Sequence, residues 1–516
     1  MTFSVNRLFA ARLLGTLTAG SLIATPLMAQ VTPPPVMMPA PAAPSTPLAR
    51  PQAQTAPAIT TTPVAPSIAN PATAAIPTLS EPQMRQLAML IAQGEVAQGL
   101  RQGPPRDLST LSATALTRVA LDYAHAVHVG RLDPGDFTKD WGIRPQPFDA
   151  APGFANAVRG DRLAAWVASL PPPYAGYDAL VKGLARYRAM AAAGGWSALP
   201  STTINFGASG PQVLALRKRL AMEDPAVSTT GDRFDEDLLA AVRRAQRRYG
   251  LNPVGTVGGQ TVAMLNVPVA QRIRQIMANM ERWRWLPQQL EAKRVQVNIA
   301  AAVLTVFDGD NPVMSMKAVT GRPGNETPML VSTIRSIVLN PPWNVPSSIA
   351  NKELWPKEKA NPGYLKRAGF RVIDNGDGSK RLQQSSEKSA LGRYKFDFPN
   401  DFAVYLHDTP AQSGFSKFDR LASHGCVRLE KPAELASLML KSTPEWQQPQ
   451  IDATIASGKT VRATMAEPVA VYLLYWTAFA NADGQVGFRE DPYGWDAQLA
   501  TKIEARSAER AQSTRD

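Results

Sequence analysis

The spacing of apolar residues divides the chain into a helical first half and a strand-rich second half. A Glu81-Pro82 pair can open a helix, with proline near the first turn, where its missing N–H is not needed. Met84 and Leu87 then follow at helical spacing. Similar patterns predict further helices at 113–129, 162–169 and 177–193. We therefore expect a helical domain over residues 80–200.

Residues 205–268 show a second, compact set of helical patterns. Apolar positions predict helices at about 210–220, 235–249 and 259–265, and a turn-rich link joins the last two. No strand precedes the glycines of this link and no Lys-Ser/Thr follows them, so they are predicted to serve turns and not a phosphate. The pattern is that of a small domain built from short helices.

Beyond residue 290 the pattern becomes that of strands. Residues that favour strands cluster at 295–299, 303–307, 313–321, 334–339 and 402–406. We expect a mixed β domain over 290–466. A C-terminal segment at 467–516, with a charged tail, is expected to pack on the helical domain.

A stretch at about 347–390, rich in Lys, Pro, Gly and Ser, interrupts the predicted strands. A loop of this length in a compact domain is a lid, a binding loop or a disordered segment. Trp343, Trp355 and Tyr364 can supply its walls, and a core or surface role for them is equally open.

The N-terminus has the order of a secretory signal peptide, with Arg7 and Arg12, a short apolar stretch and Ala29 at the break. A retained membrane anchor is the alternative, but Gly20 and Pro26 interrupt a stretch that is short for a bilayer. We expect a signal peptide at 1–29 and no transmembrane segment after its cleavage. Residues 30–79, dominated by Pro, Ala and Thr, predict a disordered linker.

The charge and the cysteine content fit an exported protein. The formal net charge of +13 would suggest nucleic acid as the partner of a cytoplasmic protein. Export removes that partner and leaves an anionic wall polymer, a membrane surface or solubility alone. A single cysteine excludes an intramolecular disulfide, so its thiol stays unpaired in an oxidising compartment.

Cys426 and its neighbours carry the candidate chemistry. Cys426 is the only cysteine, and His407 and His424 are two of the four histidines. A neighbouring imidazole lowers the cost of forming the nucleophilic thiolate. Gly425 lets the backbone approach a ligand closely, and the N–H groups around Gly425, Cys426 and Val427 can converge on an oxyanion.

Alternatives stay open at this site. A buried structural cysteine is the simplest of them. His424, two residues from Cys426, and the more distant His407 compete for the role of base, and the sequence does not choose between them. Ligand types alone also permit zinc bound by His407, His424 and Cys426. We expect no metal and no cofactor.

The pattern His407…Ser423-His424-Gly425-Cys426-x-Arg428 resembles the signature of the L,D-transpeptidases, the YkuD-type cysteine enzymes of peptidoglycan cross-linking. Flanking runs resemble the large Gram-negative subfamily typified by YcbB, at 282–287, 340–346, 395–400 and 475–478. The likeness extends from about residue 80 to 496. One departure is Ser389, where relatives often begin an Asn-Ala-Leu-Gly run, and it puts any role of an asparagine there in doubt.

The resemblance implies an α+β multidomain protein. Its parts would be a mostly β L,D-transpeptidase catalytic domain with a lid-like insertion over the active site, a helical N-terminal domain and a small three-helix peptidoglycan-binding domain. Cys426 would be the nucleophile and His407 its base. The residues implied around the oxyanion and the substrate are His424, Gly425, Val427, Ser423, Arg428 and Tyr405.

Such an enzyme acts on tetrapeptide stems. It forms a thioester with release of D-Ala, and the amine of a second stem resolves the thioester to give a 3→3 cross-link. The implied partners are donor and acceptor stems of peptidoglycan, with carbapenem-type β-lactams as acylating inhibitors, in the periplasm at the cell wall. The alternatives are an L,D-carboxypeptidase, in which water resolves the thioester, a lipoprotein lysine as acceptor, and a non-catalytic peptidoglycan-binding protein.

Overall fold

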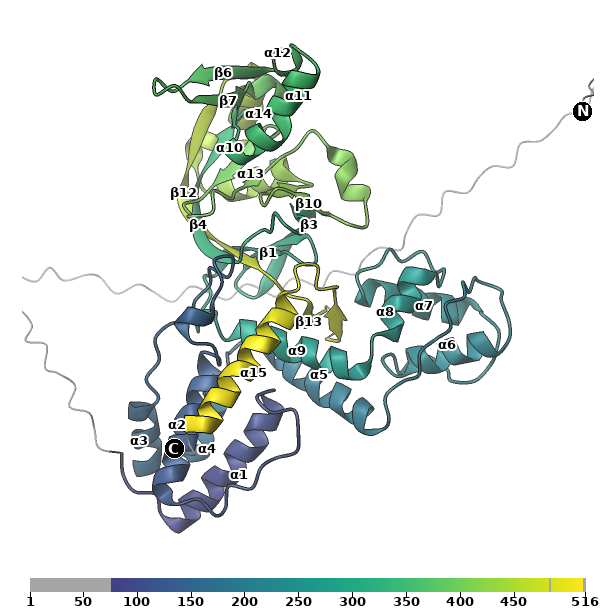
Figure 1. Cartoon of the computed structure of the whole chain (residues 1–516), viewed down its shortest axis with the longest axis vertical. Coiled ribbons are helices and arrows are strands. Elements are labelled where there is room, and N and C mark those ends of the chain that lie inside the picture. Colours follow the sequence, from purple (N-terminus) through teal and green to yellow (C-terminus); the bar gives the residue numbers. More distant parts are fainter. Residues whose placement is uncertain (1–75, 482–483, 514–516) are drawn as a thin grey trace, which may run out of the picture. The chain divides into compact units, whose positions relative to one another are not determined.

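The computed structural model describes residues 76–481 and 484–513 (Figure 1). The predicted signal peptide and most of the predicted linker lie outside these residues. Leu79 is buried and Ile76 packs on the same core, so ordered structure begins before the predicted linker boundary at residue 79. Within the described ranges, no helix combines the length and the apolar character needed to cross a membrane.

The first described helices share one hydrophobic core. The first of them begins after Ser80, whose hydroxyl accepts from the Gln83 N–H while the Gln83 side chain accepts from the Ser80 N–H. Leu87, Leu116 and Phe154 are almost fully buried in this core. The bounds of these helices are α1 Glu81–Ala97, α2 Ala113–His128, α3 Ala151–Arg159 and α4 Leu163–Ala168, with η1 Pro134–Asp136 between α2 and α3. The next helix, α5 Ala175–Ala192, belongs to a second core, in which its Leu180 and Leu184 are fully buried.

The predicted set of short helices follows, as α6 (Pro211–Ala221), α7 (Glu236–Arg248) and α8 (Gly259–Asn266). Asp235 caps α7, because its side chain accepts from the Leu238 N–H. The long helix α9 (Val269–Trp283) then packs against α5. Its last residue, Trp283, stacks on Trp476 with ring centroids 4.4 Å apart.

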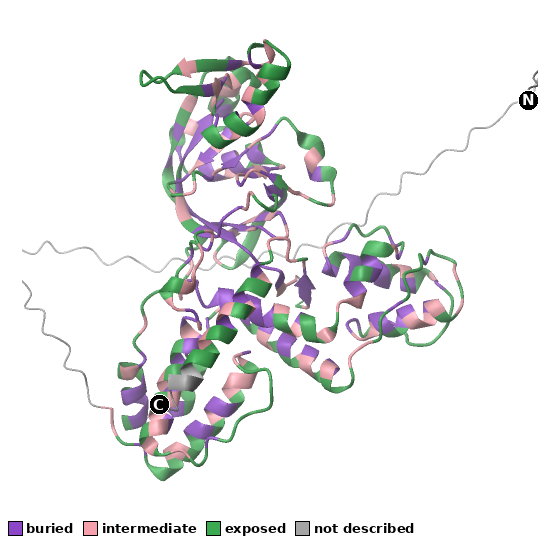
Figure 2. Cartoon of the chain, in the orientation of Figure 1, coloured by how far each residue is buried: buried purple, intermediate pink, exposed green. Residues whose placement is uncertain are grey.

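The strand-rich half forms a sheet of nine strands, in the order β10-β3-β11-β9-β8-β4-β12-β1-β2, and an additional β2–β3 pairing closes it into a ring. Figure 2 shows buried positions running through these strands, and Val297, Ile337 and Leu406 are fully buried in its core. The bounds are β1 Lys293–Asn298, β2 Val303–Asp308, β3 Asn311–Gly321, β4 Leu330–Leu339, β8 Tyr394–Asp397, β9 Leu406–His407, β10 Leu421–Ser423, β11 Val427–Leu429 and β12 Val461–Leu474, with α13 Pro432–Leu440, η5 Pro444–Trp446 and α14 Gln448–Ser457 packed beside them.

Two sequence-based boundaries in this sheet need correction. Strand β12 continues past the predicted boundary at 466, because its second half pairs with both β1 and β4. The predicted strand at 402–406 is reduced to β9. Asn400 is the physical reason: its side-chain oxygen accepts from the N–H groups of Phe402 (3.0 Å) and Val404 (3.1 Å) and bends the chain into a turn.

The stretch at 347–390 is an ordered subdomain and not a disordered loop. It has its own hydrophobic core, in which Leu354, Leu365 and Leu382 are buried. Trp343, Trp355 and Tyr364 are half-buried and pack on this core. The bounds, including the strand that leads into it, are β5 Trp343–Asn344, α10 Ser347–Ile349, η2 Ala350–Leu354, α11 Trp355–Ala360, α12 Tyr364–Arg367, β6 Phe370–Asp374, β7 Lys380–Gln384 and η3 Ser386–Lys388 (Figure 1).

The C-terminal segment forms β13 (Ala478–Ala480), β14 (Val486–Phe488) and α15 (Trp495–Ser513). Helix α15 contacts α9, and β13 contacts α5. Arg506 of α15 also bonds Asp136 at 2.7 Å. This segment therefore packs on the helical half, and the α+β multidomain prediction is confirmed.

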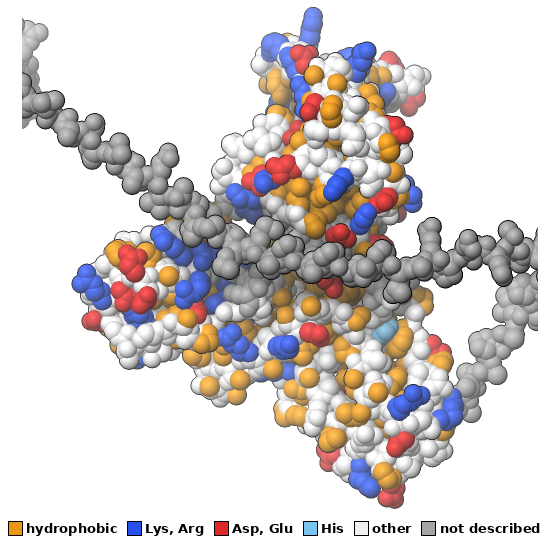
Figure 3. Space-filling model, turned by 180° about the vertical axis from the view of Figure 1, so that it is seen from behind, with side chains coloured by type: hydrophobic (Ala, Val, Ile, Leu, Met, Phe, Trp, Pro, Cys, Tyr) orange, Lys and Arg blue, Asp and Glu red, His pale blue; other side chains and the backbone are white. Residues whose placement is uncertain are grey.

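The basic charge is distributed rather than gathered. On the face drawn in Figure 3, Lys and Arg side chains are spread over several elements and interleaved with Asp and Glu. The positive charge on this face therefore marks no single binding surface.

Candidate active site

The turn between β10 and β11 is held by its own side chains and by the neighbouring strands. Ser423 donates its hydroxyl to the Cys426 carbonyl at 2.5 Å and accepts from the Gly425 N–H at 3.1 Å. Gly425 has φ of 112°, and a Cβ there would lie 3.3 Å from the Glu326 carbonyl. Glycine is therefore required for this conformation, and the predicted tight turn is present.

The Cys426 thiol is half-buried on one face of the sheet. Its sulfur lies 3.9 Å from the Ala403 carbonyl, to which the thiol donates. Burial raises the pKa of Cys426 above its ordinary value of 9.0, while hydrogen bonds from the backbone N–H and the hydroxyl of Tyr405 act against the rise. The thiol is therefore the favoured form, although two donors are in place for a thiolate.

His407 lies on the strand beside this turn. The parallel pairing of β9 with β11 puts His407 opposite Arg428, and its ring centroid is 5.6 Å from that of Tyr405. The side chain is buried, and its Nδ1 donates to the Asp408 carbonyl at 2.5 Å. Because a carbonyl only accepts, this bond assigns the proton to Nδ1 and leaves the lone pair on Nε2.

The electrostatics keep His407 neutral. Burial, together with the positive charges of Arg428 and Lys395, lowers its pKa to about 3 against the opposing effect of the Asp408 and Leu391 carbonyls. A neutral imidazole can accept a proton at any pH near neutrality. His407 is thus in the protonation state that a general base needs.

His424 faces the insertion. Its Nε2 lies 2.6 Å from Oε1 of Glu353, which also forms an ion pair with Arg322 at 3.7 Å. In the part of the chain that the structure describes, neither histidine is hydrogen-bonded to the thiol. Catalytic hydrogen bonds are often long before substrate binds, so this observation does not remove either histidine from consideration.

Comparisons with protein families identify the regions in which these residues lie. The family model described as "L,D-transpeptidase catalytic domain" (YkuD) matches residues 292–448. A model described as "Scaffold domain" matches 82–184, and one described as "Putative peptidoglycan binding domain" matches 209–265. The chain carries an L,D-transpeptidase catalytic domain.

One curated relative shares this identity. A protein of Haemophilus influenzae named "Putative L,D-transpeptidase" is 32% identical over 242 residues, which cover 44% of this chain and 49% of that protein. The chain therefore spans about half the length of the curated relative that it matches.

Solved structures of L,D-transpeptidases are more distant. The enzyme of Stackebrandtia nassauensis is 13% identical, over 54% of this chain and 97% of its own, with a TM-score of 0.23. L,D-transpeptidase 3 of Mycobacterium tuberculosis with a faropenem-derived adduct is 20% identical, over 35% of this chain and 60% of its own, with a TM-score of 0.18. Likenesses this low carry no argument about the present site.

Within the L,D-transpeptidase domain, two predicted oxyanion donors must be corrected. The Val427 N–H donates to the Tyr405 carbonyl at 3.1 Å as part of the sheet, so it is not free for substrate. The Gly425 N–H is bonded to the Ser423 hydroxyl oxygen at 3.1 Å, so it is not free for substrate either. The Cys426 N–H makes no such bond among the described residues and is the donor that the turn leaves available.

Lys395 and Glu353 were missed from the sequence, and Trp343 was expected only as a wall of the insertion. Lys395 lies 4.3 Å from the centre of the Tyr405 ring, and its charge acts on the thiol. Trp343 hydrogen-bonds the Tyr405 hydroxyl. Both stand in runs that carried the family resemblance, so a signal was present. Glu353 had none, because it stands in the insertion, seven residues beyond the run at 340–346 and outside every motif.

The ligand set of the zinc alternative is not assembled. Among residues 76–481 and 484–513, no group of three or more His, Cys, Asp or Glu side chains is placed to hold one metal ion.

A cavity of about 450 Å³ lies away from this site, beside β1 and β2, where Trp283 and Arg294 line it. Cys426 is not part of that cavity.

Proposed function

We propose that the protein is an L,D-transpeptidase that forms 3→3 cross-links in peptidoglycan through a cysteine thioester. The arrangement around Cys426 carries the proposal: a lone thiol, two Tyr405 donors for its thiolate, and a neutral His407 on the adjacent strand. The match of residues 292–448 to the catalytic domain supports the same reaction class.

The first half-reaction would form the acyl-enzyme. Nε2 of His407 takes the thiol proton, and the sulfur attacks the carbonyl between diaminopimelate and D-Ala in a tetrapeptide stem. The Cys426 N–H would stabilise the oxyanion. His407 then returns the proton to the leaving D-Ala, and the stem stays on the sulfur as a thioester.

The second half-reaction would resolve the thioester. The side-chain amine of a second stem attacks the same carbonyl, an amide bond forms, and Cys426 leaves. If water attacks instead, the product is a tripeptide and the protein is an L,D-carboxypeptidase. The match of residues 209–265 to a peptidoglycan-binding domain supports a polymer substrate, and we place the protein in the periplasm at the cell wall.

Incubation with a disaccharide-tetrapeptide, followed by mass spectrometry, tests the proposal. A cross-linked dimer that has lost one D-Ala supports it, and a tripeptide alone indicates the carboxypeptidase. No change in the substrate indicates a binding protein. Cys426→Ala is the control, and full turnover by this variant would disprove the mechanism.

A carbapenem-type β-lactam gives a second, independent reading. Its strained ring would acylate Cys426 and add its mass to the intact protein. Because Cys426 is the only cysteine, Cys426→Ala should carry no thiol adduct. This experiment tests the first half-reaction without any acceptor.

A further inference from the structure

The insertion reaches the catalytic turn through Glu353. This residue lies in η2 (Ala350–Leu354), a π-helical turn of a type that is frequent at functional sites. The side chains of Glu353, His424 and Arg322 are 34%, 27% and 49% exposed, so an incoming molecule can touch all three. A carboxylate from a separate subdomain is thus presented at the turn that holds the nucleophile.

The contact fixes the tautomer of His424. A carboxylate oxygen only accepts, so the 2.6 Å contact requires the proton on Nε2 and leaves Nδ1 with the lone pair of the neutral ring. Arg322 only donates and cannot bond a protonated Nε2. Its 3.3 Å approach to that atom therefore reflects its ion pair with Glu353. A carboxylate that orients an imidazole in this way is the arrangement found in hydrolase triads.

We propose that Glu353 determines the acceptor: it draws a primary ammonium group to His424 and so favours an amine over water at the thioester. The inference rests on the proposed transpeptidase function and concerns only its second half-reaction. A stem amine is protonated at neutral pH and must lose a proton before it attacks. Water carries no charge and gains nothing from the carboxylate.

The protons balance in this step. The ammonium group gives one proton to Nδ1 of His424, and the free amine attacks the thioester carbonyl. The C–N bond forms and the C–S bond breaks, and a second proton passes from nitrogen to sulfur. The products are an amide and the Cys426 thiol, and His424 then releases its proton to solvent.

Glu353→Gln tests the proposal. Glutamine keeps an oxygen that can accept from His424, so the insertion stays in contact with the turn while the charge is lost. Glu387→Gln is the matched control, because Glu387 is an exposed carboxylate of the same insertion. The measurements are the rate of carbapenem addition to Cys426 and the ratio of cross-linked dimer to tripeptide over a series of acceptor concentrations.

For Glu353→Gln we expect the dimer-to-tripeptide ratio to fall about tenfold, with a raised KM for the acceptor, while acylation changes much less. Hydroxylamine is an amine that is uncharged at neutral pH, so the rate at which it captures the thioester should be the same in Glu353→Gln and in the wild type. An unchanged ratio, or an equal loss in Glu387→Gln, overturns the inference. A wild-type protein that makes an adduct but never a dimer overturns the transpeptidase proposal itself.

Discussion

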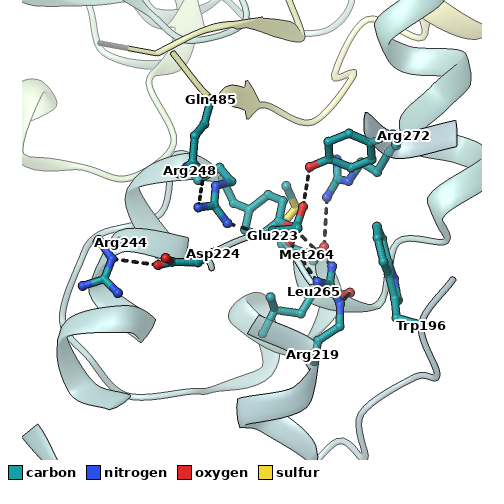
Figure 4. Close-up of polar contacts among 12 residues, drawn as sticks. Trp196, Arg219, Glu223, Asp224, Arg244, Arg248, Met264, Leu265, Arg272 and Gln485 are labelled. Carbon is teal, nitrogen blue, oxygen red and sulfur yellow. Dashed lines mark hydrogen bonds and ion pairs between the residues drawn. The ribbon is translucent and has the colours of Figure 1, made fainter. Parts of the chain in front are cut away.

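Two regions of the molecule bury ionisable groups and treat them in opposite ways. In the helical half, the carboxylate of Glu223 is fully buried and accepts from Arg219 at 2.8 Å and from the hydroxyls of Tyr187 and Tyr249 (Figure 4). Burial alone would raise its pKa, but the charges of Arg219 and Arg248 and the two hydroxyls lower it to about 2. The buried carboxylate in this cluster is therefore compensated by two guanidinium groups and two hydroxyls.

The Cys426 site lacks such compensation. Burial lowers the pKa of His407 to about 3 and raises that of the thiol, and among the described residues no carboxylate is hydrogen-bonded to either group. The Glu223 cluster links α6 and α7 to Tyr187 of α5, so its ions are part of the structure. At Cys426 the thiolate and the protonated imidazole of His407 are both unfavourable. In the proposed reaction, they would form only when a substrate supplies an oxyanion and a leaving group. The difference separates a structural ion cluster from a pair of groups that suits the proposed reaction.

The largest expected effect is at His407. His407→Gln can still donate to the Asp408 carbonyl but has no base, so we expect carbapenem addition to Cys426 to slow by about 10²–10⁴-fold. Because His407 is buried, the free energy of unfolding should fall by about 0.5–3 kcal/mol. The matched variant His424→Gln should slow acylation by less than about tenfold. Equal losses in both variants would contradict the assignment of His407 as the base.

The pH dependence of alkylation tests the electrostatics directly. Because the pKa of Cys426 is raised and that of His407 is about 3, thiol and imidazole are both neutral between pH 4 and 8. The rate of iodoacetamide addition should therefore rise about tenfold per pH unit toward a midpoint above pH 9, which is about 10³-fold from pH 6 to 9. A plateau between pH 4 and 7 would instead reveal a thiolate–imidazolium pair.

Glu223→Gln tests the compensated cluster. It leaves the buried Arg219 without its anion, and we expect the free energy of unfolding to fall by about 3–5 kcal/mol in urea titrations. Asp224→Asn is the control, because its partner Arg244 is 40% exposed, and a loss of about 1 kcal/mol is expected there. A similar loss of unfolding free energy in Glu223→Gln and Asp224→Asn would show that burial of the ion pair does not determine how much it stabilises the fold.

The same cluster should confer acid sensitivity. The folded pKa of Glu223 lies below its ordinary value of 4.5, so its contribution to stability is complete above pH 4.5 and is lost as the pH falls toward 2. Over that window Glu223→Gln should lose less stability than the wild type. If the free energy of unfolding falls equally with pH in Glu223→Gln and in the wild type, other carboxylates dominate the acid unfolding.

The sequence predicted most of the helices and the long strands, because each has one apolar face with a regular period. Helix α3 (Ala151–Arg159) was missed, since Pro152 and Gly153 in its first turn resemble a loop. Strand β9 was drawn too long because Asn400, a side chain that bonds backbone atoms, overrides local strand preference.

At the candidate site, the sequence indicated which residues lie near one another but not the hydrogen bonds that they make. Cys426, His407, Tyr405 and the Gly425 turn come together as expected. The Val427 N–H is used in a hydrogen bond of the sheet. This bond depends on the pairing of β9 with β11, which are distant in sequence. The Glu353–His424 contact spans 71 residues and depends on how the insertion folds, so no local pattern could reveal it.

The smallest expected effect isolates a single donor at the uncompensated site. Tyr405→Phe keeps the ring against His407 and Lys395 but removes the hydroxyl that hydrogen-bonds the thiolate. The pKa of Cys426 should rise further, and iodoacetamide addition at pH 7 should slow about three- to tenfold. Tyr394→Phe, a buried tyrosine of the adjacent strand β8, is the control and should leave the rate unchanged. Equal rates for Tyr405→Phe and the wild type would mean that the backbone N–H of Tyr405 alone supports the thiolate.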